Sequence, residues 1–220
     1  MKKVFICLAN SKKYGERCIA GIEITGFDGA NYSIVKADSH PKWLRPVSQK
    51  EHGEVSASLV GRLNLLDVVE FEMLSECPRG YQSENVFFDE RSLRVIGRID
   101  WVSDHVAQFE HHRGALLFGN KGKAVHVDVI DQISYSLILI RPSNLSFNEV
   151  TYANGKHQLR ANFIYNGREY DLPITDVDFF NKYTKNPDEF TKFSEYFFTL
   201  SLGVEHEDFH YKLVAAVFYF

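Results

Sequence analysis

The segment His206-Glu207-Asp208-Phe209-His210 matches H-E-x-x-H, the pattern of zinc proteases. That chemistry needs both histidines on one face of a helix, with the glutamate placed to activate a zinc-bound water. Here the flanking residues are SLG before the segment and a β-like run after it, so we predict a loop or hairpin. The ten residues after His210 also lack any His, Asp, Glu or Cys that could be a third ligand. The sequence therefore predicts no metal site.

Cys18 is a candidate nucleophile, because Arg17 beside it would lower the pKa of the thiol. The alternative is a buried structural cysteine, since Cys18 opens an expected strand. The pair His111-His112 could touch a metal or phosphate, but solvated histidines near the C-terminus of a helix account for it as well. Motifs of serine hydrolases, P-loop NTPases and dinucleotide-binding proteins are absent. We therefore predict no catalytic residues and no cofactor, with an enzyme that uses Cys18 as an alternative.

Three polar segments combine aromatic, amide and cationic side chains: residues 10–17, 42–46 and 78–85. Aromatic rings interleaved with Lys and Arg are suited to holding single-stranded nucleic acid or a nucleotide. The structural alternative makes Trp43 a core residue and leaves Lys12 and Lys13 as solvated charges. The candidate ligand-binding residues are Asn10, Ser11, Arg17, Trp43, Arg45, Tyr81, Gln82 and Asn85.

The composition limits the classes of partner. The 220 residues have a formal net charge of -4, so any binding to a polyanion must depend on a local patch. Three cysteines leave an odd one over, which suits a reducing compartment. The apolar run at residues 4–9 is shorter than the roughly 7–15 residues of a signal peptide, and no run approaches a membrane span of roughly 18. We predict a cytoplasmic protein without a membrane partner; nothing in the sequence assigns an oligomeric state.

The elements that must position these residues are mostly strands. Alternating or continuous apolar runs predict strands over residues 4–9, 18–25, 32–37 and 65–74, joined by turns such as GFDGAN. No helical pattern separates the early strands, which excludes the crossover connections of a parallel sheet. The pattern therefore predicts a small barrel or sandwich.

Residues 93–109 repeat apolar side chains at three- and four-residue steps, which predicts an amphipathic helix near residues 93–112. The following run FGNKGKA, at residues 118–124, is the expected interdomain turn. We therefore predict an N-terminal domain over residues 1–118 and a C-terminal domain over residues 123–220.

The second domain restarts with strands, and Asn166-Gly167 predicts a tight hairpin. Short helices are expected near residues 176–197, with a last strand over residues 211–220. The motifs WLRP at residues 43–46 and LIRP at residues 139–142 could be remnants of a repeat.

Several motifs together resemble a known family, the dual OB-domain proteins of bacteria. They are ANSKKYGERCIAGIE, WLRPVS, YQSENV, YDLPITD and SLGVEHEDFHYKLVAAV, spread from Ala9 to about Val217. The resemblance implies a mainly β protein of two tandem OB-like five-stranded Greek-key barrels with a few short helices, a fold whose open face often binds oligonucleotides. It also implies an association with bacterial defence or mobile elements, and it brings no biochemical activity.

Three functions follow as hypotheses. The first is a non-catalytic module that binds single-stranded nucleic acid or a nucleotide, with Arg17, Trp43 and Arg45 as its contact face. The first alternative is a module that binds or senses a protein partner from the same operon, through an apolar patch at the C-terminal VFYF. The second alternative is the enzyme that uses Cys18.

Overall fold

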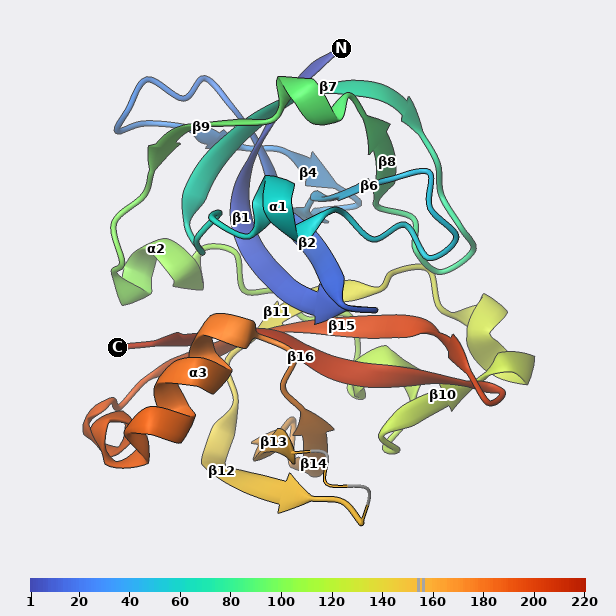
Figure 1. Ribbon diagram of the computed structural model, residues 1–220, viewed down its shortest axis with the longest axis vertical. Coiled ribbons are helices and arrows are strands. Elements are labelled where there is room, and N and C mark those ends of the chain that lie inside the picture. Colours follow the sequence, from blue (N-terminus) through green and yellow to red (C-terminus); the bar gives the residue numbers. More distant parts are fainter. Residues whose placement is uncertain (154, 156) are drawn as a thin grey trace. The chain divides into compact units, whose positions relative to one another are not determined.

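The computed structural model describes residues 1–153, 155 and 157–220 and divides the chain into two compact units, Met1–His111 and His112–Phe220 (Figure 1). The turn at residues 118–124 thus belongs to the second unit. Within the described residues, no helix has both the length and the apolar character that crossing a bilayer requires.

The N-terminal unit is a closed five-stranded barrel. Strand β1 (Lys2–Lys13) pairs with β2 (Glu16–Thr25), and β2 pairs with β6 (Trp43–Val47). Strand β6 runs parallel to β8 (Asn85–Phe88), which pairs with β7 (Asp67–Glu76), and β7 returns to β1. The five strands therefore close in the order 1-2-3-5-4, with a parallel pairing between the third and the fifth, which is the arrangement of an OB barrel.

Short elements fill the connections of this barrel. Strands β3 (Ser33–Ile34), β4 (Lys36–Ala37) and β5 (His40–Pro41) lie between β2 and β6. Helix α1 (Ala57–Val60) lies between the third and fourth barrel strands, and the 3-10 turn Glu90–Ser92 follows β8.

Aromatic and aliphatic side chains from all five strands fill the barrel. Phe71 meets both Phe5 and Phe88 edge-to-face at 5.8 Å between ring centroids. Strands β1 and β2 approach so closely that a Cβ at Gly21 would lie 1.9 Å from the carbonyl oxygen of Ile6. Only glycine therefore fits this crossing of the first two strands.

The predicted helix over residues 93–109 is wrong in its first half. Arg94–Arg98 form strand β9, which pairs with residues 67–70 of β7, and only Ser103–Ala107 form a helix, α2. The β-branched Val95 and Ile96 favour an extended chain, and a bulge in this pairing breaks the two-residue alternation that would have marked a strand. Gly97 lies under the ring of Phe27, where a Cβ would come within 2.6 Å.

The C-terminal unit has two sheets. One contains β12 (Ser143–Thr151), β13 (His157–Tyr165) and β14 (Arg168–Pro173). The other has the order β10-β16-β15-β11. Its strands are β10 (Ala124–His126), β16 (Phe209–Tyr219), β15 (Tyr196–His206) and β11 (Leu137–Ile140). Two 3-10 turns, Leu117–Gly119 and Val127–Gln132, flank β10.

These sheets repeat the connectivity of the first barrel in a half-closed form. Strands β11 and β12 are two halves of one bent first strand: β11 pairs with β15 and β12 pairs with β13. The third and fifth strands meet at a parallel bridge between Ile174 and Val214, beside which Thr175 N donates to Val214 O over 2.8 Å. The predicted fold class, mainly β with two tandem OB-like barrels, is confirmed, and its second barrel is a half-barrel.

The strand positions of the two units remove the suspected repeat. WLRP lies on β6, the third strand of its barrel, whereas LIRP ends the first half of the first strand of the other. The two motifs therefore do not occupy equivalent positions.

Local signals explain the connections of the C-terminal unit. Asn166 and Gly167 have φ of 49° and 74° and join β13 to β14, so the predicted hairpin is confirmed. Helix α3 (Val177–Lys185) begins after Asp176, whose Oδ1 accepts from the amide of Phe179 over 3.0 Å. The 3-10 turn Pro187–Lys192 follows it.

Candidate ligand-binding site at one end of the N-terminal barrel

Most of the sequence-predicted site residues are buried. The side chains with no more than 9% exposure are Ser11, Trp43, Arg45, Tyr81, Gln82 and Asn85. Asn10 and Arg17 are half-buried. Contacts within the fold give several of these side chains a structural role, and their binding of a ligand stays a prediction.

The indole ring of Trp43 is covered by His111, the last residue of the N-terminal unit. Its Nε1–H donates to Nε2 of His111 over 3.3 Å, and the two residues are 6% and 5% exposed. Nδ1 of His111 lies 2.9 Å from the carbonyl oxygen of Phe109, to which it donates. Because Nε2 accepts, His111 is the neutral tautomer with its proton on Nδ1. The indole ring therefore presents no open face on which a base could stack.

Arg45 and the loop before β8 come together as one buried polar cluster. Nη2 of Arg45 lies 2.8 Å from Oε1 of Glu84, and the Arg45 amide donates to the Glu84 carbonyl over 2.9 Å. Next to this pair, Nδ2 of Asn85 donates to Oε1 of Gln82 over 3.1 Å. Pairing of a buried charge offsets its desolvation, so this cluster fixes the loop at residues 77–84 against β6.

Asn10 and Arg17 hold the segment after α1. Nδ2 of Asn10 donates to the carbonyls of Val60 and Leu63, each over 2.8 Å. Arg17 donates through Nη1 to the carbonyl of Asn10 over 3.3 Å, and its backbone pairs with Val55. These side chains therefore serve the fold of the barrel end.

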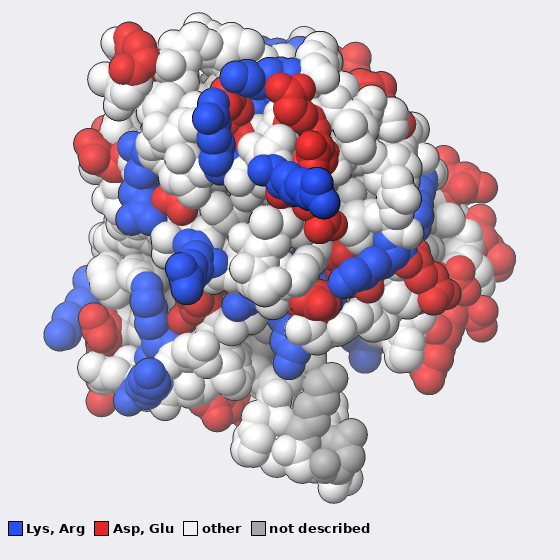
Figure 2. Space-filling model, turned by 45° about the horizontal axis from the view of Figure 1, so that its top comes forward, with Lys and Arg blue, Asp and Glu red and all other residues white. Residues whose placement is uncertain are grey.

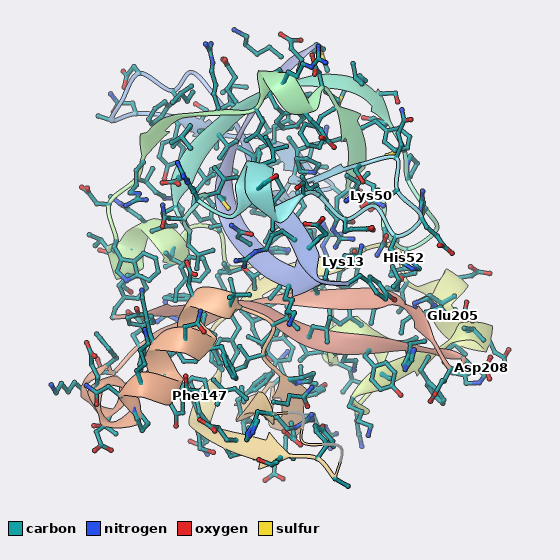
Figure 3. The ribbon with its side chains drawn as sticks, in the orientation of Figure 1. Lys13, Lys50, His52, Phe147, Glu205 and Asp208 are labelled. Carbon is teal, nitrogen blue, oxygen red and sulfur yellow. The ribbon has the colours of Figure 1, made fainter. Side chains whose placement is uncertain are left out.

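Three loops meet at this end of the barrel: the β1–β2 turn, the β7–β8 loop and residues 48–55 after β6. The first two overlap the predicted polar segments 10–17 and 78–85, and the third was not predicted. Tyr14, in the β1–β2 turn, stacks on His52 at 4.1 Å between ring centroids. Nη1 of Arg79, in the β7–β8 loop, donates to the carbonyl of Glu51 over 2.9 Å. Figure 3 shows Lys13, Lys50 and His52 near one another here. We call the side chains at this end the barrel mouth: Lys13, Tyr14, Lys50, His52 and Arg79.

Within the barrel mouth, Lys13 is the cation whose surroundings compensate its charge least. Burial lowers the pKa of its ammonium group; nearby Arg45 and Arg79 lower it further, while Cys18 and Glu54 oppose the shift. Among the described residues, Lys13 has no hydrogen-bond acceptor and no ion-pair partner, whereas Lys50 pairs with Glu16 at 3.4 Å. A half-buried cation without an ion-pair partner is a candidate anion site.

The two motifs that could belong to an enzyme lie on strands of different units. The H-E-x-x-H segment spans the turn between β15 and β16, with His206 opposite Phe209 in the ladder, so it is the predicted hairpin. Figure 3 labels Asp208 within the segment and Glu205 just before it. Cys18 is half-buried on β2. Over the part of the chain that is described, no three His, Cys, Asp or Glu side chains gather to hold a metal ion.

The chain matches a known protein family. A family model described as the dual OB-containing domain matches residues 3–217. The chain belongs to this family. A comparison with curated proteins finds no match. OB domains generally bind nucleic acids or oligonucleotides, through the face of their second and third strands and the loops between strands one and two and strands four and five.

In this dual OB-containing protein, those loops are the β1–β2 turn and the β7–β8 loop. Both belong to the barrel mouth, which contains Lys13, Tyr14 and Arg79. These three residues lie in the predicted polar segments but not among the candidate site residues, and the loop positions of OB ligands would have selected them from sequence.

The C-terminal unit offers a different surface. A pocket of about 450 Å³ lies against β13 and β14, and its polar lining comprises Asn144, Asn162, Glu169, Tyr170 and Asp171. Its ionisable lining side chains are carboxylates and a phenol, which disfavours phosphate.

Over the face drawn in Figure 2, basic and acidic side chains are interspersed, so attraction of a polyanion must be local.

Proposed function

We propose that this protein is a non-catalytic binding protein whose N-terminal OB barrel holds nucleic acid or a nucleotide at the barrel mouth. The supporting observation is the position of Lys13, a half-buried cation without an ion-pair partner in the described part of the chain. It ends β1, beside the β1–β2 turn, where OB barrels contact their ligands. A role in bacterial defence stays a prediction from the family resemblance.

Two further features support the same location. The Arg79 guanidinium donates to the neutral carbonyl of Glu51 and pairs with no carboxylate in the described part of the chain, so its charge is available to a phosphate. Tyr14 is 57% exposed and already stacked on His52, which offers an aromatic surface for a base.

The test is a fluorescence anisotropy titration of labelled single-stranded DNA and RNA with the full chain. For about three phosphate contacts on a single strand, raising salt from about 50 to about 200 mM should weaken binding about 20-fold. Lys13→Met should lower the slope of log K against log salt by about 1. Lys12→Met, an exposed neighbour on the opposite side of β1, is the matched control. Failure to retain any oligonucleotide or nucleotide even at low salt rules the function out.

A second candidate function is binding to a protein partner, for which β9 supplies a specific observation. It is the last strand in the order of its sheet, and Val95 and Ile96 on it are 48% and 38% exposed. An exposed edge strand with apolar side chains can accept an extended segment of another protein. The expected apolar patch at VFYF is wrong for Val217 and Phe218, which are 1% and 0% exposed.

Co-purification from the native host distinguishes the two candidates. A stoichiometric protein partner that resists nuclease, is lost from Ile96→Lys and is kept by Lys13→Met supports docking at β9. A partner that nuclease removes from the wild-type protein contradicts protein docking at β9 and supports nucleic-acid binding at the barrel mouth.

A further inference from the structure

We propose that the barrel mouth recognises a terminal phosphate monoester, on a nucleotide or on the phosphorylated end of a strand, rather than the interior of a long single strand. This inference rests on the proposed function and names the class of ligand.

Part of the barrel face is closed. Outward from β6, Trp43 is covered by His111, whose ring also lies 5.8 Å from His40. The preceding residues are fixed as well: Phe109 stacks on Tyr32 at 6.5 Å, and Nε2 of Gln108 donates to the Tyr32 hydroxyl over 2.5 Å. The unit's own C-terminal segment thus occupies the place where successive bases would stack.

This covering limits the length of ligand that can bind. Proteins that hold long single strands present several exposed aromatic rings along a charged groove. Here the aromatic residue on the third strand, Trp43, is 6% exposed. Tyr14 and His52 are the rings at the barrel mouth, and because they form one stacked pair they offer room for about one base.

The cations of the barrel mouth favour a doubly charged ligand. Lys13 and Arg79 both lack an ion-pair partner among the residues whose structure is described, whereas Arg45 is paired with Glu84 and Lys50 with Glu16. Two cations without ion-pair partners can both contact a phosphate monoester, whose charge is about −1.5 to −2. A phosphodiester within a strand has a single negative charge and is attracted less strongly by the same pair.

Two acidic residues lie near these cations. Glu54 lies close enough to act on the charge of Lys13, whereas Glu51 accepts from Arg79 through its neutral backbone carbonyl. The Glu54 carboxylate lowers the net positive charge of the site and repels every anion in proportion to its charge. The preference for a terminal phosphate therefore depends on contact with both cations.

The experiment compares ligands that differ in one feature. Dithymidylate with and without a 5′-phosphate, adenosine 5′-monophosphate and unphosphorylated oligothymidylates of increasing length are titrated into the full chain by calorimetry. We expect the 5′-phosphate to strengthen binding of dithymidylate about tenfold, which is about 1.4 kcal/mol. Lengthening the strand should add little.

The variants and outcomes separate this inference from the proposed function. Lys13→Met and Arg79→Gln should each remove the advantage of the 5′-phosphate, and Lys12→Met should keep it; matching thermal midpoints show that the variants are folded. Binding that strengthens with length and ignores the 5′-phosphate overturns the inference and leaves the proposed function intact. Lack of binding to every ligand overturns both.

Discussion

The indole N–H of Trp43 donates to Nε2 of His111 over 3.3 Å, and this hydrogen bond joins two residues 68 positions apart in the chain. It connects the third strand of the N-terminal barrel to the last residue of its unit and closes the outer side of that strand. Both side chains are buried, so each satisfies a polar group of the other.

Replacing His111 by alanine should destabilise the N-terminal unit. The Trp43 N–H would remain buried without an acceptor, at a cost of about 1–3 kcal/mol in the free energy of unfolding. Urea denaturation measures this loss, and His105→Ala, at a half-buried position on α2, should cost less than about 1 kcal/mol. Equal stability of the two variants would contradict the role assigned to the hydrogen bond.

Gly21→Ala should disrupt the first barrel more severely. The new Cβ would lie 1.9 Å from the Ile6 carbonyl oxygen and 2.5 Å from the ring of Phe5, so β1 and β2 would have to separate. We expect a loss above about 3 kcal/mol. At Gly15 a Cβ meets nothing within 4 Å, and the positive φ of 82° alone should cost Gly15→Ala about 1–2 kcal/mol. Thermal unfolding that ranks Gly15→Ala below Gly21→Ala in stability would refute this order.

Lys212 should make stability depend on pH. It is fully buried and donates to the carbonyl and side-chain oxygens of Asn120 at 2.8 and 2.9 Å, and burial lowers its pKa from 10.5 to about 7. Between these values the unfolded chain binds more protons, so the contribution of Lys212 to stability rises with pH.

The comparison is with Lys212→Met, whose unfolding free energy is measured across the same pH range. The unfolding free energy of the wild-type protein should rise relative to that of the variant by up to about 1.4 kcal/mol per pH unit between about pH 7 and 10. Parallel curves for the two proteins would show that Lys212 titrates normally.

The contribution of Asp176 to stability should fall as pH rises, opposite to that of Lys212. Its two oxygens accept from the amides of Phe179 and Val217, each over 3.0 Å, and burial raises its pKa to about 6 from 3.8. The stabilising contribution of the protonated group is complete below pH 3.8 and is lost as pH rises through 6.

Asp176→Ala should therefore cost about 2–4 kcal/mol, from the lost helix cap and the unsatisfied Val217 amide. The cost should be larger at pH 4 than at pH 7. Asp178→Ala, a neighbour in the first turn of α3, should cost less than about 1 kcal/mol. A cost of Asp176→Ala that grows with pH would reverse the predicted sign.

The sequence predicted the β class and the hairpin at Asn166-Gly167 because these signals are local. The helix over residues 93–109 failed because β9 is defined by its pairing with β7 and by a bulge, neither of which a single segment reveals. Trp43 was considered as a ligand contact because its acceptor, His111, is distant in sequence.

The candidate site was predicted only in part, because it too depends on contacts between residues that are distant in sequence. Charge and aromatic content marked loops of the barrel mouth, but the burial of Arg45 and the lack of a partner for Lys13 in the described chain depend on the fold. The loop positions of OB ligands, rather than residue types, point to Tyr14 and Arg79.

Photocrosslinking tests the central claim most directly. A short 5′-phosphorylated RNA that contains 4-thiouridine is irradiated with the full chain, and the crosslinked peptides are identified by mass spectrometry. We predict crosslinks within residues 12–17, 48–55 and 77–84, weakened by Lys13→Met and unchanged by Lys12→Met. Crosslinks confined to the C-terminal unit would contradict the assignment of binding to the barrel mouth.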